Sequence, residues 1–357
     1  MEVKKWILRF AFVSCACATS SAVAETFEYY DQTLAPAVTS ASCESGCSDN
    51  CDTSICDTYS CASSLACDSA CCSASKGCNC GNCSSAGGLL GLGILAKSDF
   101  CFADFISPMT NPVFFEDPRT LSELRFIFLS HKLPAALGGN SVQVYAMQAR
   151  AALTDRLSVI ATKDGFISTQ SPVLQSGVAD VAAGLKYNLY RDVQAGRLVS
   201  VGTTYEIPMG SNKSLQGNGN GEFHFFVTAG TRVGSRGHWI SAAGLREPLD
   251  TNLENRVAYW SNHLDRQIGD RPLYAFTELN WYNYMSSGNA FGLPIEGGDL
   301  FNLGSVGITG NDLVTHAIGL KARPKRNIEA GVAWEYPMTA RKGLMDNRLT
   351  ADLILRY

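Results

Sequence analysis

Apolar and polar side chains alternate along the chain from about Leu121 to the carboxy terminus. The last segment shows the alternation most clearly. Its apolar face carries Leu349, Ala351, Leu353, Leu355 and Tyr357, and its polar face carries Arg348, Thr350, Asp352 and Arg356. A period of two residues is that of a β-strand with one apolar face and one polar face. The pattern therefore predicts an all-β region.

Turn-forming residues divide this region into twelve predicted strands. Their ranges are 121–131, 141–153, 157–166, 178–190, 197–208, 222–234, 238–247, 255–264, 271–285, 312–323, 326–338 and 346–357. The alternation is weakest in 157–166, 238–247 and 255–264. Short connections, such as 154–156, alternate with long polar ones, such as 211–221 and 286–311. Short turns that alternate with long loops are typical of transmembrane β-barrels.

A soluble β-sandwich also alternates and is the competing interpretation. It does not usually combine long runs of apolar residues on one face with ionised groups on the other face of so many strands. In lipid every backbone amide must be paired, so a spanning sheet must close on itself. We therefore predict an antiparallel transmembrane β-barrel of about twelve strands over residues 114–357. Leu353, Leu355 and Tyr357 would form the carboxy-terminal signal that barrel-assembly machinery reads.

The polar faces of the predicted strands carry both signs of charge. The candidate lumen-lining residues are Arg125, Asp180, Lys186, Glu206, Arg232, Glu278, Lys321, Glu329, Glu335, Asp352 and Arg356. A barrel of twelve strands is narrower than porins of 16 to 18 strands. Two interpretations follow: the charges form ion pairs that fill the lumen, or they line a polar or partly plugged conduit.

Composition narrows the class of protein. Charged residues make up 17% of the chain, compared with about 25% in soluble globular proteins. No uninterrupted apolar run reaches the roughly 18 residues that a transmembrane helix needs. The formal net charge of −4 argues against nucleic acid as a partner. A membrane β-barrel combines a low charged fraction with the absence of a long apolar run, because it crosses the bilayer with strands and its outer face carries little charge.

The amino terminus resembles an export signal. Lys4 and Lys5 precede an apolar stretch over 10–18, and Ala22-Val23-Ala24 places small residues before Glu25. This is the layout of a secretory signal peptide, which predicts cleavage after residue 24. Processing as a lipoprotein at Cys15 is the alternative. Export predicts an outer-membrane protein with its leader in the periplasm.

Residues 25–113 form a predicted cysteine-rich, largely irregular leader and linker. Its cysteines are Cys43, Cys47, Cys51, Cys56, Cys61, Cys67, Cys71, Cys72, Cys78, Cys80, Cys83 and Cys101. Large apolar residues are scarce over 43–83, so order there would need cross-links or metal. Three interpretations stay open: internal disulfides, which the oxidising compartment favours, thiolate binding of a soft metal, and disulfides to neighbouring proteins.

Catalytic motifs do not occur in the sequence. It contains no H-E-x-x-H metal motif and no G-x-S-x-G nucleophile elbow. Outer-membrane phospholipase, a twelve-stranded enzyme, makes a Ser/His dyad the alternative to consider. His316 falls on the predicted lipid-facing register, but no serine is predicted beside it. We expect neither enzymatic activity nor a cofactor.

Two predicted strands carry a family resemblance. The sequence Gly184-Leu185-Lys186-Tyr187-Asn188-Leu189, followed after a turn by Tyr205-Glu206-Ile207-Pro208-Met209-Gly210, resembles the meta-pathway phenol-degradation family of outer-membrane barrels. The resemblance spans about residues 114–357, and the cysteine-rich leader departs from it. It implies a transporter for hydrophobic aromatic compounds and carries over no binding residues.

Two functions are therefore predicted. The first is an outer-membrane channel or transporter for small, apolar or aromatic solutes, with the lipid bilayer and the barrel-assembly machinery as partners. The second is a structural envelope barrel that anchors a cross-linked or metal-binding leader.

Overall fold

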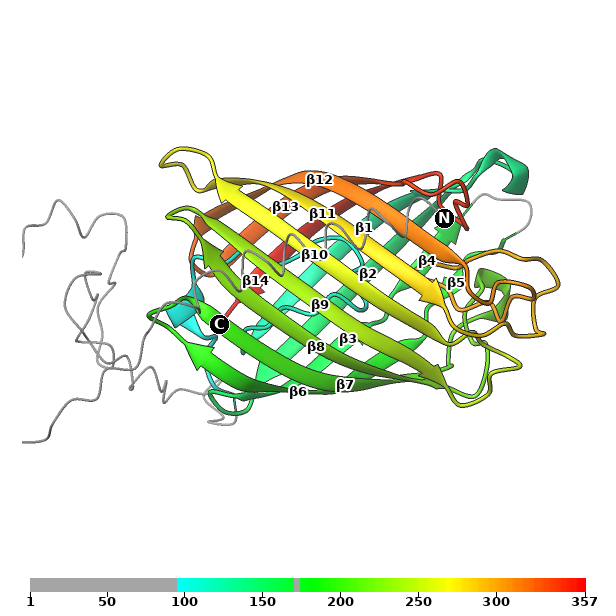
Figure 1. The fold of residues 1–357 in the computed structure, drawn as a ribbon, viewed down its shortest axis with the longest axis horizontal. Coiled ribbons are helices and arrows are strands. Elements are labelled where there is room, and N and C mark those ends of the chain that lie inside the picture. Colours follow the sequence, from blue (N-terminus) through cyan, green and yellow to red (C-terminus); the bar gives the residue numbers. More distant parts are fainter. Residues whose placement is uncertain (1–94, 170–173) are drawn as a thin grey trace, which may run out of the picture. The chain divides into compact units, whose positions relative to one another are not determined.

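The computed structural model describes residues 95–169 and 174–357. They form one closed antiparallel sheet in the order β1-β14-β13-β12-β11-β10-β9-β8-β7-β6-β3-β2, which β1 closes by pairing with β2 (Figure 1). The strands are β1 (Glu123–Lys132), β2 (Ser141–Ala152), β3 (Leu157–Lys163), β4 (Phe166–Thr169), β5 (Gly177–Val178), β6 (Val181–Asp192), β7 (Arg197–Ile207), β8 (Glu222–Val233), β9 (Gly237–Pro248), β10 (Val257–Gln267), β11 (Leu273–Tyr284), β12 (Asp312–Lys325), β13 (Ile328–Pro337) and β14 (Asn347–Arg356).

The predicted barrel of twelve strands is confirmed, because β3–β4 and β5–β6 are two interrupted strands. Both β3 and β4 pair with β2, and the break between them lies at Asp164. There the Asp164 carboxylate accepts the backbone N–H of Met147 at 2.8 Å in place of a regular ladder partner. The weakly alternating ranges 238–247 and 255–264 correspond to β9 and β10.

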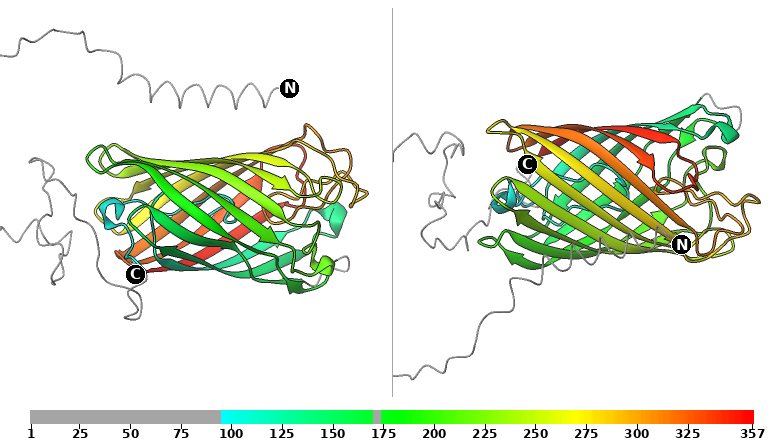
Figure 2. Two further views of the ribbon diagram at one scale, coloured as in Figure 1. Left: turned by 90° about the horizontal axis from the view of Figure 1, so that it is seen from below. Right: turned by 45° about the horizontal axis from the view of Figure 1, so that its top comes forward.

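The two ends of the barrel differ in their connections (Figure 2). Short turns over 153–156, 193–196, 234–236, 268–272 and 326–327 lie at one end, here called the short-turn end. Longer connections, such as 208–221 and 285–311, lie at the other, the long-loop end. Three short 3-10 segments complete the described elements: η3 (Phe100–Phe102), η4 (Ala135–Leu137) and η5 (Asn212–Ser214). No helix in the described parts of the chain is long and apolar enough to cross a membrane.

An apolar belt covers the outer face of the barrel. In β8, for example, burial alternates residue by residue, with Phe223, Phe225 and Val227 exposed. Other large apolar side chains exposed on the wall are Leu124, Phe126, Met147, Leu185, Leu189, Leu264, Ile318, Leu320, Val332, Trp334, Leu349, Leu353 and Leu355. The alternation follows from the pleat, which sends successive side chains to opposite faces.

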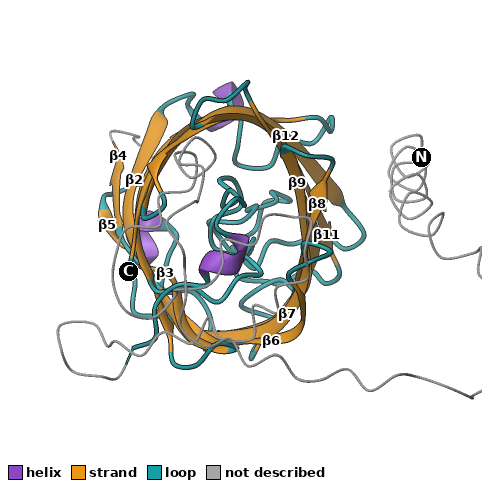
Figure 3. Ribbon diagram, turned by 90° about the vertical axis from the view of Figure 1, so that its left-hand side faces the viewer, coloured by secondary structure: helices purple, strands orange, loops and turns teal. Residues whose placement is uncertain are grey.

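Residues 98–122, here called the inserted segment, lie inside the ring of strands (Figure 3). The segment enters and leaves at the short-turn end. There the backbone N–H of Ser98 donates to the Tyr357 carbonyl at 2.8 Å, and that of Asp99 donates to the Thr120 carbonyl at 2.9 Å. One arm runs inward over 98–110, a turn follows at 111–114, and the second arm returns to β1. The predicted domain boundary at residue 114 falls in this turn.

Candidate functional site: the occupied lumen

The eleven candidate lumen residues all lie on the inner side of the sheet, and most are fully buried. They contact the inserted segment, one another or neighbouring side chains of the wall. Their nearest ionic partners are Asp352 for Arg125, Lys163 for Asp180 and Glu206, Glu116 for Lys186, Asp104 for Arg232, His263 for Glu278, Glu329 for Lys321 and Arg356, and Arg348 for Glu335. In this structure the charges therefore fill the lumen rather than line an open pore.

The second arm is held by Glu116. Its carboxylate lies 2.6 Å from Arg150 Nη2 and 2.7 Å from Lys186 Nζ. Burial alone would raise the pKa of Glu116, but the two cations outweigh it and lower that pKa to about 2. The Glu116 carbonyl also accepts the Thr228 hydroxyl at 2.8 Å. Glu116 thus ties the segment to β2, β6 and β8.

The first arm is held by Ser107. Its backbone N–H donates to Glu329 Oε1 at 3.0 Å, and its carbonyl accepts Lys321 Nζ at 2.7 Å. Its hydroxyl accepts Arg356 Nη2 at 2.7 Å and donates to Asp117 of the second arm at 2.9 Å. One residue therefore joins the two arms to each other and to β12, β13 and β14.

Deeper in the lumen, Glu278 on β11 receives the inner end of the first arm. Its carboxylate accepts the backbone N–H groups of Met109 at 2.7 Å and Thr110 at 2.6 Å. His263 Nδ1 lies 2.7 Å from Glu278 Oε1, and its Nε2 lies 3.2 Å from Asp265 Oδ2. Because each ring nitrogen faces a carboxylate, hydrogen bonds to both ionised groups require the imidazolium form of His263.

The same arrangement continues towards the short-turn end. His238 Nδ1 lies 2.8 Å from Asp265 Oδ1, and its Nε2 lies 3.1 Å from Asp104 Oδ2 of the inserted segment. Arg232 Nε donates to the same Asp104 oxygen at 2.5 Å. Burial would raise the pKa of Asp104, but hydrogen bonds from His238 and Arg232 hold it well below its usual range. Basic and acidic side chains thus alternate from Arg232 at the short-turn end to Glu278.

The inner wall near the long-loop end carries apolar side chains beside ion pairs such as Arg246–Glu222 and Arg348–Glu335. Its buried apolar side chains are Ile127, Leu129, Val142, Val144, Ile167, Val257, Tyr259, Tyr282, Tyr284 and Leu313. They pack in one cluster with Val113 and Phe114 of the inserted segment and with Leu300, Phe301, Leu303 and Ile308 of the 285–311 loop. The interior here resembles the core of a soluble domain.

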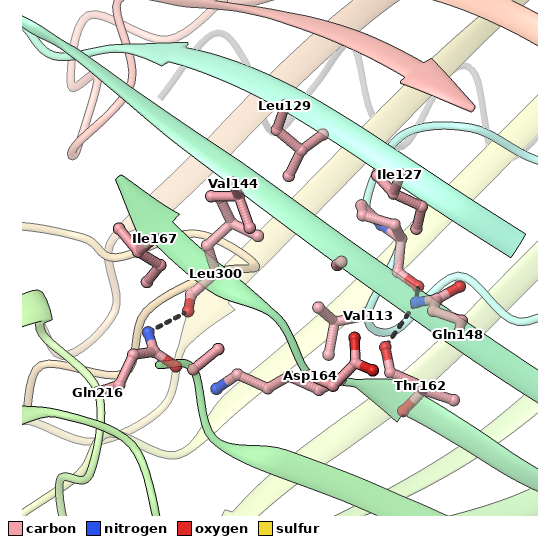
Figure 4. Close-up of a pocket in the computed structure, with 14 residues that line it drawn as sticks. Val113, Ile127, Leu129, Val144, Gln148, Thr162, Asp164, Ile167, Gln216 and Leu300 are labelled. Atoms are coloured by element: carbon pink, nitrogen blue, oxygen red, sulfur yellow. Dashed lines mark hydrogen bonds between the residues drawn. The ribbon is translucent and has the colours of Figure 1, made fainter. Parts of the chain in front are cut away.

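A small cavity of about 30 Å³ lies within this apolar region. Figure 4 shows Val113, Ile127, Leu129, Val144 and Ile167 around it. Such a volume holds a few atoms or a water molecule, but not an organic solute. This cavity is therefore too small to hold an organic solute while the inserted segment and the 285–311 loop are packed around it.

The pattern of the sequence does not predict residues 98–122 as a lumenal element. The segment alternates with neither the period of a strand nor that of a helix, so pattern reasoning assigns it no element. The signal available was composition: the stretch 100–118 carries Phe100, Phe102, Phe105, Phe114 and Phe115 beside a leader that is poor in large apolar residues. Such aromatic side chains need an apolar environment.

Other predicted sites are placed as follows. His316 faces outward, with Nε2 2.8 Å from Thr277 Oγ1 and Nδ1 3.0 Å from Tyr336 Oη. Cys101 lies half-buried in η3 at the short-turn end. The other eleven leader cysteines, and the predicted signal peptide, lie outside the described residues.

Three solved structures illustrate what the fold is similar to. An outer-membrane channel from Pseudomonas putida F1 has a TM-score of 0.49 at 12% identity, over 71% of this chain and 100% of the channel. The NanC porin has a TM-score of 0.44 at 8% identity, over 66% of this chain and 100% of the porin. The KdgM porin, solved with oligogalacturonate, has a TM-score of 0.41 at 8% identity, over 66% and 99%. No family model matches the sequence, and no curated protein matches it.

Proposed function

We propose that the protein is an outer-membrane channel for small apolar solutes, closed in this structure by the inserted segment. The belt of exposed apolar side chains on a closed sheet supports a bilayer environment, because such a surface is unfavourable in water. Export by the predicted signal peptide supports the outer membrane. Assembly through the carboxy-terminal strand and a periplasmic position for the leader belong to the same proposal.

The apolar part of the inner wall near the long-loop end is the observation that carries the solute class. Lumens of water-filled barrels are polar, whereas here Ile127, Val144 and Leu313 face inward with tyrosines around them. Hydrated ions bind weakly to a wall of this kind, whereas contact with apolar groups is favourable. It agrees with the aromatic cargo that the family resemblance implies.

A sealed structural barrel is the second candidate. The dense pairing of lumenal charges favours it, because buried ion pairs with both partners in place hold their elements together. In that case the barrel would serve as an anchor for the leader. We propose no catalytic function, since the contacts of His316 to Thr277 and Tyr336 supply no nucleophile with a base and orienting group.

Flux through a shortened protein tests the channel and its solute class together. Deletion of residues 100–119 joins Asp99 to Thr120, which already share a backbone hydrogen bond. In proteoliposomes we expect this variant to admit a small uncharged aromatic alcohol faster than an organic ion of similar size, relative to protein-free vesicles. The full-length protein serves as the control with the segment in place. Absence of flux in both proteins would contradict the channel and favour the sealed barrel.

A further inference from the structure

Phe114, in the turn of the inserted segment, lies in a recess formed by three side chains of the wall. The guanidinium carbon of Arg246 lies 4.4 Å from the Phe114 ring centre. The His224 ring meets it edge-on with centres 4.9 Å apart, and the Tyr259 ring centre lies 5.8 Å away. A cation over the face and a ring edge-on are geometries that recognise a π system. The recess is therefore selective for an aromatic ring over an aliphatic group of the same size.

The recess belongs to the strands and not to the inserted segment. Arg246 is fixed by Glu222, whose Oε1 lies 2.7 Å from its Nε. The Tyr259 ring lies so close to the wall that a Cβ on Gly244 would fall 2.6 Å from its Cε1. His224 stacks on Phe226 at 5.0 Å. Because β8, β9 and β10 hold these groups, the recess would keep its shape if Phe114 left it.

A polar contact accompanies the ring contacts. The Tyr259 hydroxyl donates to the Phe114 carbonyl at 2.7 Å, and His224 Nε2 lies 2.8 Å from the same hydroxyl oxygen. Tyrosine has a single hydroxyl proton, so His224 must donate the second hydrogen bond. If Phe114 left, the Tyr259 hydroxyl would lose its acceptor in a buried setting. An oxygen atom attached to an incoming ring could replace it.

We propose that Arg246, His224 and Tyr259 form a binding site for an aromatic ring that bears an oxygen acceptor, and that Phe114 occupies this site while the inserted segment is seated. The inference rests on the proposed function and deepens it. Solute and segment then compete for one site. Because the solute binds only when Phe114 is out, its presence shifts the population towards the released segment.

The test uses the full chain with Phe114→Ala, which empties the recess. The probes are benzyl alcohol and cyclohexylmethanol, which share a hydroxyl and similar size but differ in the π face. Dissociation constants are measured by NMR titration in detergent. We expect benzyl alcohol to bind about fivefold tighter or more than cyclohexylmethanol. In the protein without residues 100–119, which also lacks the Phe114 carbonyl, the added change Tyr259→Phe should weaken binding of benzyl alcohol.

Met109→Ala is the matched control. It also removes a buried apolar side chain of the inserted segment, but it opens space beside Phe276 and Ala333 instead of the recess. We expect this variant to show no preference for benzyl alcohol. If Phe114→Ala lacks heat-modifiable gel mobility and so has not folded, the protein without residues 100–119 takes its place, since it lacks Phe114 altogether.

Equal binding of benzyl alcohol and cyclohexylmethanol in the folded variant would contradict the proposed binding site. That result is distinct from failure of the channel. Flux of apolar solutes with no preference for an aromatic ring would contradict the binding site but not the proposed function. Preferential binding with no flux would support the site and contradict the proposed function.

Discussion

At the scale of single residues, Glu254 in the 249–256 loop is a buried carboxyl for which no ion pair is found among the described residues. It is 2% exposed, and its Oε2 has no hydrogen-bond partner within the described residues. Burial, reinforced by the nearby carboxylates of Glu222 and Glu206, raises its pKa to about 8. The neighbouring Arg246 and Lys163 only partly oppose this rise. Glu254 therefore stays protonated at neutral pH while the loop is packed.

A pH dependence of stability follows from Glu254. The folded protein holds a proton between pH 4.5 and about 8 that the unfolded chain releases, so stability falls as pH rises across that window. The loss is up to about 1.4 kcal/mol for each pH unit. Urea unfolding at pH 5, 7 and 9 measures it. We expect Glu254→Gln to flatten this part of the profile, whereas an unchanged slope in the variant would contradict the assignment.

At the scale of elements, the strands and the inserted segment differ in how far the sequence predicts them. Each strand residue faces either the outside or the lumen, so the period of two predicts the twelve strands of the wall, but not the separate short strands β4 and β5. The inserted segment is surrounded by the wall on all sides and has no such constraint. Its contacts, such as Glu116 with Lys186, join residues far apart in sequence. Candidate lumen charges could thus be predicted, but their partners in the segment could not.

The seating of the second arm can be weakened selectively with Glu116→Gln. The change removes the charge that pairs with Arg150 and Lys186 and leaves those cations less compensated. Loss of one partner of a buried pair costs about 3 kcal/mol or more when it is complete. Because Gln keeps some hydrogen bonding, we expect at least about a tenfold rise in the fraction of time that single channels are open.

Glu247→Gln provides the comparison for that experiment. Glu247 also pairs with an arginine, Arg256, but both side chains are about one-third exposed at the long-loop end. Pairs of this kind contribute little to stability, so the open fraction should match that of the unmodified protein. Similar open fractions in the two variants would argue against Glu116 as a tether.

At the scale of the whole molecule, the structure combines a lipid-compatible wall with an interior that is filled as a soluble core is filled. The short-turn half is held mainly by alternating charges, and the long-loop half by apolar packing against the 285–311 loop and Phe114 together with ion pairs such as Arg246–Glu222. Both halves meet on the inserted segment, which enters beside the carboxy terminus. We infer that the inserted segment keeps the lumen closed.

Single-channel recording in planar bilayers tests whether the inserted segment keeps the lumen closed. The full-length protein and the protein without residues 100–119 are compared at the same lipid composition and salt, after heat-modifiable mobility shows that both barrels are folded. We expect the full-length protein to be mostly closed and the shortened one to show a steady, larger conductance. Equal conductance in the two proteins, or none in either, would contradict this expectation.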